Sequence, residues 1–190
     1  MQSLQNMDLN LLRFIHDNLQ NPILDRIVPF ITYLGNGGIL WITITVALVI
    51  TKRYRRIGLI CGLALLVNTI IGEGILKHLF QRQRPFVLVP TVDLIIPKPS
   101  SYSFPSGHTS TAFAAAGILA TQFKKYRLPI TILAVLIALS RLYLFVHYPS
   151  DILTGVIVGL FSAKIVLRFY PSDKKYKLGV PKQGFTIKED

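Results

Sequence analysis

The sequence predicts an all-α membrane protein, a polytopic helical bundle of five transmembrane helices preceded by an N-terminal amphipathic interfacial helix. Apolar residues make up 51% of the 190-residue chain, and its mean hydropathy is +0.48. Several apolar stretches approach the roughly 20 residues that a helix needs to cross a bilayer. Between these stretches lie short runs of Lys and Arg, which total 21 against 9 Asp and Glu. Together these observations place the chain outside the ordinary soluble class.

The charge and cysteine content exclude several kinds of function. A net charge of +12 is also found in nucleic-acid-binding proteins, but here the basic residues follow the pattern of cytoplasmic loops. We therefore expect no nucleic-acid partner. Cys61 is the single cysteine, so neither an internal disulfide nor a thiolate metal cluster can form. Residues 1–20 are polar and interrupted, which argues against a cleaved signal peptide.

The first segment, residues 1–34, is expected to lie on the outer surface of the membrane. Its apolar positions are mixed with charged residues that include Arg13, Asp17, Asp25 and Arg26. A full crossing would bury these charges at a cost of roughly 3 kcal/mol each. We expect one or two amphipathic helices instead, broken near Pro22.

Residues 35–170 are expected to form the transmembrane core of a single domain. The five expected spans cover residues 35–51, 57–80, 105–123, 128–146 and 151–169. Trp41 lies near one end of the first span, where aromatic residues favour the membrane interface.

The distribution of positive charge predicts the orientation of the bundle. Ten basic residues fall on one side of the membrane: Lys52, Arg53, Arg55, Arg56, Lys124, Lys125, Arg127, Lys174, Lys175 and Lys177. Cytoplasmic loops retain Lys and Arg, so this side is expected to be the cytoplasm, with residues 171–190 as a basic cytoplasmic tail. Residues 81–104 and 147–150 then face outward from a multi-pass protein of the plasma membrane.

Three cationic side chains lie in or beside the spans. Lys77 and Arg84 are two helical turns apart and share a helix face until Pro85 ends the helix. The pair could simply extend to the membrane interface. Arg141 lies in an otherwise apolar span, where a functional role facing the bundle interior is the default interpretation. Its alternative is an ion pair with Glu73 or another acid.

Two histidines occur beside helix starts on the expected outer face. His108 follows Ser106 and Gly107, whose backbone N–H groups would be unpaired in a first helical turn and could bind an anion. His147 precedes Pro149 and Asp151 in a short turn, and Asp151 is placed to cap the last span. A simple cap at each site and an interfacial role for His147 are the alternatives. The convergence of three cations, a helix start and two histidines nevertheless indicates a phosphate pocket with a nucleophile and an acid.

Three motifs resemble the signatures of a known family. KHLFQRQRP (Lys77 to Pro85), PSGH (Pro105 to His108) and SRLYLFVHYPSD (Ser140 to Asp151) are similar to KxxxxxxRP, PSGH and SRxxxxxHxxxD of the type 2 phosphatidic acid phosphatase superfamily. All three occur in order and without a mismatch, across roughly residues 55 to 170. The family core usually has six spans, and the one missing here would be the first, with residues 8–34 resembling the outer amphipathic segment of the family.

The resemblance implies a role for each matched residue. His147 would be the nucleophile that forms a phosphohistidine, and Asp151 would hold its ring in the reactive tautomer. His108 would protonate the leaving oxygen and then activate water. The remaining five residues would hold the phosphoryl oxygens: Lys77, Arg84, Ser106, Gly107 and Arg141. The resemblance requires no metal and no cofactor.

The resemblance implies a membrane lipid as the substrate but does not select one. Undecaprenyl pyrophosphate, phosphatidylglycerophosphate and phosphatidic acid all fit an outward pocket at the bilayer. Transfer of the phosphoryl group to a lipid acceptor and non-enzymatic binding of an anionic lipid are the alternatives. We also expect Glu73 to pair with or orient Lys77, Asn68 to join two helices, and residues 86–104 to shape substrate access. The sequence makes no prediction of oligomeric state.

Overall fold

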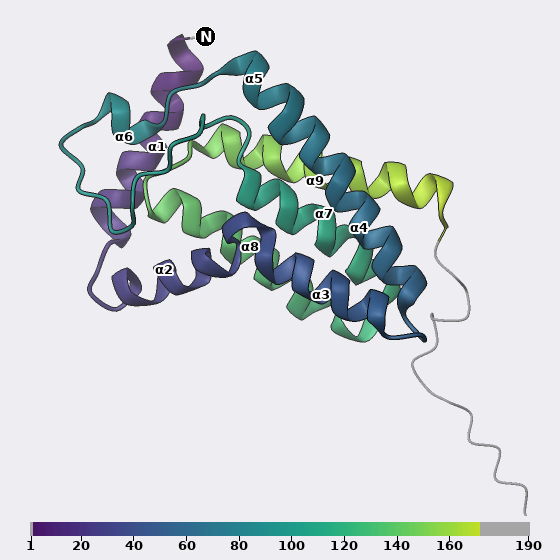
Figure 1. The fold of residues 1–190 in the computed structure, drawn as a ribbon. Coiled ribbons are helices and arrows are strands. Elements are labelled where there is room, and N and C mark those ends of the chain that lie inside the picture. The colour runs from purple at the N-terminus through teal and green to yellow at the C-terminus, as the bar shows by residue number, and fades with distance from the viewer. Residues whose placement is uncertain (1, 172–190) are drawn as a thin grey trace, which may run out of the picture.

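The computed structural model describes residues 2–171, which are helical with connecting turns and contain no strand. The expected tail, residues 171–190, lies outside the described residues except for Pro171, and so do Lys174, Lys175 and Lys177. The elements are α1 (Gln2–Leu19), α2 (Leu24–Leu34), the 3₁₀ turn η1 (Asn36–Gly38), α3 (Ile39–Ile50), α4 (Arg55–Thr69), the π-helical turn η2 (Ile70–Leu76), α5 (Lys77–Phe80), α6 (Pro85–Leu88), α7 (Gly107–Gln122), η3 (Lys124–Tyr126), α8 (Arg127–Tyr143) and α9 (Pro149–Phe169) (Figure 1).

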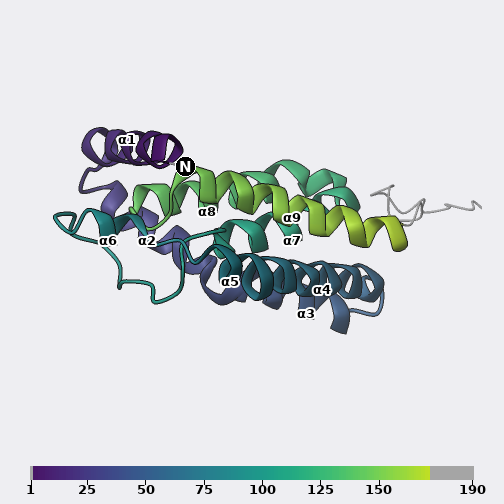
Figure 2. The ribbon, with the colours of Figure 1, turned by 90° about the horizontal axis from the view of Figure 1, so that it is seen from above.

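The N-terminal segment forms two helices, with the expected break near Pro22. Asn21 lies between the two helices: its Nδ2 donates to the carbonyl of Leu19, the last residue of α1, at 3.0 Å, and its Oδ1 accepts the backbone N–H groups of Ile23 and Leu24 at 3.1 and 3.0 Å. α1 lies across one end of the bundle (Figures 1 and 2). Leu12 of α1 is fully buried in a cluster that includes Phe145 and Tyr148. The first helix is therefore packed onto the segment that joins α8 to α9.

The expected spans correspond to helices whose ends differ by a few residues. α3 starts at Ile39 rather than at residue 35, because Gly37 and Gly38 adopt positive φ values of 56° and 68° in the preceding turn. The second span is continuous from Arg55 to Phe80 but contains the π-helical turn η2. α8 ends at Tyr143, three residues before the expected end, and residues 144–146 form a turn.

α7 is the central helix and contacts α4, α8 and α9. α7 contains four buried alanines: Ala112, Ala114, Ala115 and Ala116. On α9, a Cβ atom added at Gly155 would lie 2.9 Å from the carbonyl oxygen of Ser106, and one at Gly159 would collide with the carbonyl of Ser110. Small residues thus allow α7 and α9 to approach closely, as in other membrane bundles. This contact brings the start of α9 against the start of α7.

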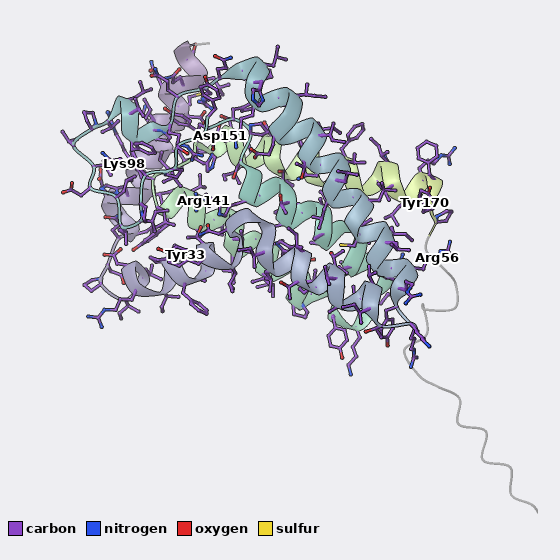
Figure 3. The ribbon with its side chains drawn as sticks, viewed as in Figure 1. Tyr33, Arg56, Lys98, Arg141, Asp151 and Tyr170 are labelled. Atoms are coloured by element: carbon purple, nitrogen blue, oxygen red, sulfur yellow. The ribbon has the colours of Figure 1, made fainter. Side chains whose placement is uncertain are left out.

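The chain is a membrane protein with several apolar helices. By length and composition, three of the described segments can cross a membrane, Arg55–Leu88, Lys124–Tyr143 and Pro149–Phe169, and a fourth is possible if α2 and the Asn36–Ile50 segment, bent by 43°, form one span. α7 has only 16 residues and is enclosed by its neighbours. The labelled side chains show two poles: Tyr33, Lys98, Arg141 and Asp151 lie at one end, and Arg56 and Tyr170 lie at the other (Figure 3).

Candidate active site

A cavity of about 610 Å³ opens at the end of the bundle that holds Arg141. The structure brings six of the eight expected site residues to its wall: Lys77, Arg84, Gly107, His108, Arg141 and His147. They come from α5, the segment before α6, the start of α7, the end of α8 and the turn before α9. The other two, Ser106 and Asp151, lie fully buried behind this wall.

The ring of His147 is held between a carboxylate and a guanidinium. Its Nδ1 lies 3.4 Å from Oδ2 of Asp151, and its Nε2 lies 3.2 Å from Nη1 of Arg84. These partners assign the proton to Nδ1, because the carboxylate accepts and the guanidinium donates. Burial lowers the pKa of His147 to about 3, and the positive charges of Arg84 and Arg141 act in the same direction. The ring is therefore neutral near pH 7, with the lone pair of Nε2 directed toward Arg84.

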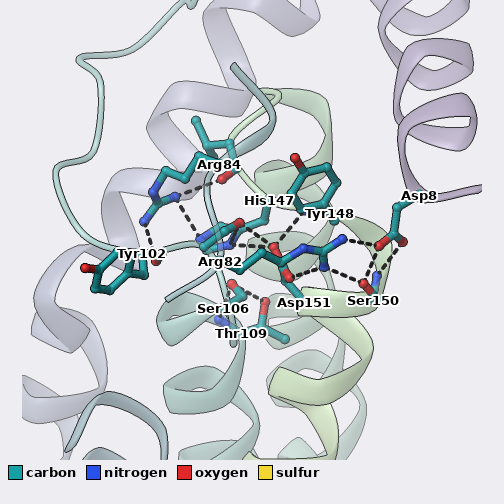
Figure 4. Close-up of polar contacts among 12 residues, drawn as sticks. Asp8, Arg82, Arg84, Tyr102, Ser106, Thr109, His147, Tyr148, Ser150 and Asp151 are labelled. Atoms are coloured by element: carbon teal, nitrogen blue, oxygen red, sulfur yellow. Dashed lines mark hydrogen bonds and ion pairs between the residues drawn. The ribbon is translucent and has the colours of Figure 1, made fainter. Parts of the chain in front are cut away.

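Asp151 both caps α9 and holds His147. Its Oδ2 accepts the backbone N–H of Tyr148 at 2.9 Å and the hydroxyl of Ser103 at 2.5 Å (Figure 4). Its Oδ1 accepts Nη1 of Arg82 at 2.7 Å. The cap that the sequence offers as an alternative thus exists together with the contact to His147, because one carboxylate provides several acceptor sites.

The three expected cations have different partners. Arg84 donates to the carbonyl oxygens of Ser101 and Val146 at 2.7 and 2.8 Å, so its position is fixed by backbone. Arg141 donates to Oγ1 of Thr32 at 2.5 Å, and its buried Nε has no hydrogen-bond partner. Within residues 2–171, no acid forms an ion pair with Arg141, in contrast to the alternative raised by the sequence. An unsatisfied buried donor next to a cavity is suited to an anionic ligand.

The remaining cation, Lys77, forms an ion pair with Glu73. Its Nζ lies 2.8 Å from both carboxylate oxygens, which confirms the expected pairing. Glu73 belongs to the π-helical turn η2, a distortion that is frequent at functional sites. The carboxylate also lies against Gly107, where an added Cβ atom would collide with it. Glu73 therefore stands beside Lys77 at the start of α7.

His108 faces the cavity from the first turn of α7 and has a partner that the sequence analysis missed. Its Nε2 lies 2.7 Å from Oδ1 of Asn36, in the turn before α3. Gly35 permits this approach, because a Cβ atom there would lie 2.8 Å from Cδ2 of His108. The Asn-Gly-Gly sequence was the available signal, since a turn of this composition allows close backbone approach.

Ser106 and Pro105 differ from their expected positions. Pro105 precedes the helix instead of starting it, because Ser106 is the N-cap and Gly107 the first helical residue. The backbone N–H of Ser106, expected to be unpaired, donates to the carbonyl of Asp151 at 3.2 Å. The Ser106 side chain accepts from Oγ1 of Thr109 at 3.0 Å. In this structure Ser106 acts as a helix cap, and phosphate binding by Ser106 stays a prediction.

Two secondary expectations have clear structural counterparts. Asn68 of α4 donates from Nδ2 to Oγ1 of Thr111 on α7 at 3.3 Å, and so joins two helices as expected. Residues 96–101 of the outer segment line the cavity, which agrees with the expected influence of this segment on access.

Among the residues that the structure describes, no group of three or more His, Cys, Asp or Glu is placed to hold a metal ion.

Replacing Glu73 by Gln is expected to strengthen the binding of inorganic phosphate. Glu73 holds Lys77 at 2.8 Å and places a negative charge near the position of an incoming anion. Because the Glu73 side chain is 46% exposed, solvent weakens the effect, and we expect the inhibition constant for phosphate to fall only about 3- to 10-fold. Competitive inhibition assays would measure this. Asp93→Asn, a carboxylate change in the outer segment, is the matched control, and a higher inhibition constant in E73Q would contradict the argument.

Comparisons with known proteins give one family. Residues 53–175 match the model of the PAP2 superfamily. An undecaprenyl-diphosphatase of Sulfolobus acidocaldarius is 34% identical over 158 residues, which cover 82% of this chain and 75% of the relative. Phosphatidylglycerophosphatase B of Bacillus subtilis is 29% identical, covering 84% of this chain and 81% of the relative. The crystal structure of Aquifex aeolicus LpxE superposes with a TM-score of 0.75 at 30% identity, covering 85% of this chain and 95% of LpxE.

Proposed function

This chain belongs to the PAP2 superfamily and is a phosphoric ester hydrolase, and from this premise we propose that it hydrolyses a polyprenyl diphosphate through a phosphohistidine. The observation that supports the proposal is the position of Nε2 of His147, which lies 3.2 Å from Arg84 at the wall of a cavity that His108 also lines. A neutral imidazole with one nitrogen held by a carboxylate is the form that can attack phosphorus.

The proposed reaction has two transfers at the terminal phosphorus. In the first, Nε2 of His147 attacks, the bond to the leaving oxygen breaks, and His108 gives that oxygen a proton. In the second, His108 takes a proton from water, the water oxygen attacks phosphorus, the bond between phosphorus and Nε2 of His147 breaks, and inorganic phosphate leaves. Asp151 holds the ring during both steps and stabilises the charge that develops on it. After the first step His108 has lost its proton and can act as a base. After the second step His108 is protonated again and His147 is free.

Three cations would stabilise the transferred group. Negative charge spreads over the equatorial oxygens during in-line transfer, and fixed donors in a partly dry site lower its energy. Arg84 and Arg141 are 5% and 2% exposed, and their attachment to Ser101, Val146 and Thr32 fixes them before the substrate arrives. Lys77 would exchange Glu73 for a phosphoryl oxygen. The first-turn N–H of Gly107 and the hydroxyl of Ser106 complete the proposed set.

A lipid diphosphate is the proposed substrate for two reasons. A relative that is 34% identical is named an undecaprenyl-diphosphatase, and this chain covers 75% of it. The cavity is also lined by a fourth cation, the exposed Lys98, beside the three that would hold the transferred phosphoryl group. A second phosphate would find its counter-charge there. Phosphatidic acid has one phosphate, and the second phosphate of phosphatidylglycerophosphate is a diester separated from the terminal one by glycerol, so neither lipid would place a directly adjacent phosphate at Lys98.

We further propose that the site faces outward from the plasma membrane. Arg56 lies at the opposite end of the bundle from Arg141 and Asp151, and with the other basic residues of its loop it would be cytoplasmic. In this interpretation α3, α4 with α5, α7, α8 and α9 are the five spans. α1 and α2 would then lie at the outer surface, next to the lipid head groups.

A phosphate-release assay over three lipids tests the substrate. Purified protein in mixed micelles would receive undecaprenyl diphosphate, phosphatidylglycerophosphate and phosphatidic acid at equal surface density, with and without chelator. We expect the largest kcat/KM for the diphosphate and no effect of the chelator.

Lys98→Ala should lower kcat/KM severalfold for the diphosphate alone, with Lys125→Ala at the other end of the bundle as the control. An equal loss for all three lipids would contradict the diphosphate assignment, and a phosphorylated acceptor without free phosphate would indicate phosphotransfer.

A further inference from the structure

Arg82 lies behind the site and connects three segments of the chain. Its Nη1 donates to Oδ1 of Asp151 and to Oγ of Ser150, each at 2.7 Å, and its Nη2 donates to Oδ2 of Asp8 at 2.7 Å (Figure 4). The guanidinium also stacks on the ring of Tyr148, with 3.8 Å between Cζ and the ring centroid. One guanidinium thus joins α1 to the first turn of α9. Arg82 does not line the cavity.

Asp8 is one of the partners that hold Arg82 in this position. It is 5% exposed on α1, and its carboxylate accepts the backbone N–H of Ser150 at 3.0 Å as well as the Ser150 hydroxyl. Arg82 is therefore shared between two buried carboxylates, Asp8 and Asp151. Loss of Arg82 would leave the two carboxylates buried without their counter-charge, and loss of Asp8 would remove one of the two acids that hold Arg82. The three groups are therefore expected to act as a unit.

The orientation of Asp151 depends on this contact. Its Oδ2 is directed to Ser103, to the Tyr148 N–H and, at 3.4 Å, to Nδ1 of His147. Oδ1 is the oxygen that Arg82 holds. A carboxylate that is bound through one oxygen only can rotate about its last torsion, whereas one held at both oxygens has a fixed plane. The His147 contact is long, so it is sensitive to such a rotation.

We propose that Arg82 is a positioning residue, held by Asp8 of the N-terminal helix, that fixes the plane of Asp151 and through it the ring of His147. This inference rests on the proposed function, because it concerns the same pair of residues. It assigns α1 a role in the reaction: the helix supplies the second carboxylate that keeps Arg82 in place. The polar contacts of Asp8 add to the apolar packing of Leu12 in attaching α1 beside the turn of His147.

Kinetics of three variants test the proposal. Arg82→Ala is expected to lower kcat by roughly 10- to 100-fold with little change in KM, as is typical when the support of a reactive group is removed. Asp8→Asn should lower kcat about 10-fold, and the double variant should lose less than the product of the two single losses. Asp17→Asn, an exposed change on the same helix, is the matched control for Asp8 and should leave kcat unchanged.

Two further measurements separate positioning from folding and from substrate binding. Added guanidinium ion should restore part of the kcat of R82A, since it can enter the space that the side chain leaves, and thermal unfolding midpoints show whether each variant is folded. Wild-type kcat in folded R82A, or a higher KM at unchanged kcat, would overturn the proposal. His147→Ala is assayed in parallel: if it remains active, the proposed function fails, whereas an inactive H147A beside a fully active R82A rejects only this inference.

Discussion

His147→Ala is expected to lose phosphate release by about 10⁴-fold or more, because the nucleophile has no substitute at its position in the cavity wall. The pKa of about 3 keeps the ring neutral down to pH 5, since the folded-state value lies below the ordinary value of about 6.5. The loss should therefore be as large at pH 5 as at pH 8. Release of inorganic phosphate from a lipid substrate at both pH values measures it.

The control for this change is His78→Ala. His78 is exposed on α5 and does not line the cavity, and its Nδ1 lies 2.9 Å from the backbone carbonyl of Glu73, so its removal leaves every side chain of the site in place. We expect H78A to keep activity within about twofold of the unmodified chain, as surface substitutions usually do. Comparable activity in H147A and H78A would refute the assignment of the nucleophile.

His108→Asn is expected to have an effect that depends on the leaving group. A general acid matters most when the departing oxygen is strongly basic. We expect the first transfer, measured in a single turnover, to slow by roughly 10³- to 10⁴-fold with phosphatidic acid, whose leaving oxygen is an alkoxide, and by less with a lipid diphosphate. With 4-nitrophenyl phosphate, whose phenolate departs without a proton, the first turnover should be nearly unaffected. The later turnovers should be slow, because water activation also needs His108.

Stopped-flow measurement of nitrophenol distinguishes this pattern from a binding defect. H108N should release about one equivalent of nitrophenol in a burst, followed by slow turnover, while the unmodified protein shows no such separation. Equal losses with all three leaving groups and no burst would show that His108 does not handle the proton. Asn18→Ala is a suitable control, because Asn18 is exposed on α1, donates to the carbonyl of Phe14 in its own helix, and does not line the cavity.

Much of the fold follows from the composition of the sequence and from its turn-forming residues. Runs of apolar residues between basic loops were sufficient to locate five helices to within a few residues. Pro22 marked the break in the N-terminal segment, which the structure places between α1 and α2. The start of α3 was misplaced, because the backbone turn at Gly37 and Gly38 was interpreted as part of the span. The π-helical turn Ile70–Leu76 was not predicted; it contains Glu73, which contacts Lys77 and lies against Gly107 of α7.

The site was predictable where a motif residue faces the cavity. Lys77, Arg84, His108, Arg141 and His147 were found because charged side chains beside apolar spans are rare, and the structure brings all five to one wall. Asn36 and Arg82 were missed because their roles depend on long-range contacts. Arg82 meets Asp8, which is 74 positions away in the sequence, and Asn36 meets His108, 72 positions away.

The central claim is that the phosphoryl group passes through His147. Rapid chemical quench with terminally ³²P-labelled undecaprenyl diphosphate, followed by peptide mass spectrometry under conditions that preserve phosphohistidine, tests it directly. We expect transient label on His147, more label in H108N because its hydrolysis is slower, and none in H147A. Label on His108, or full release of phosphate with no labelled histidine at any time point, would contradict the account.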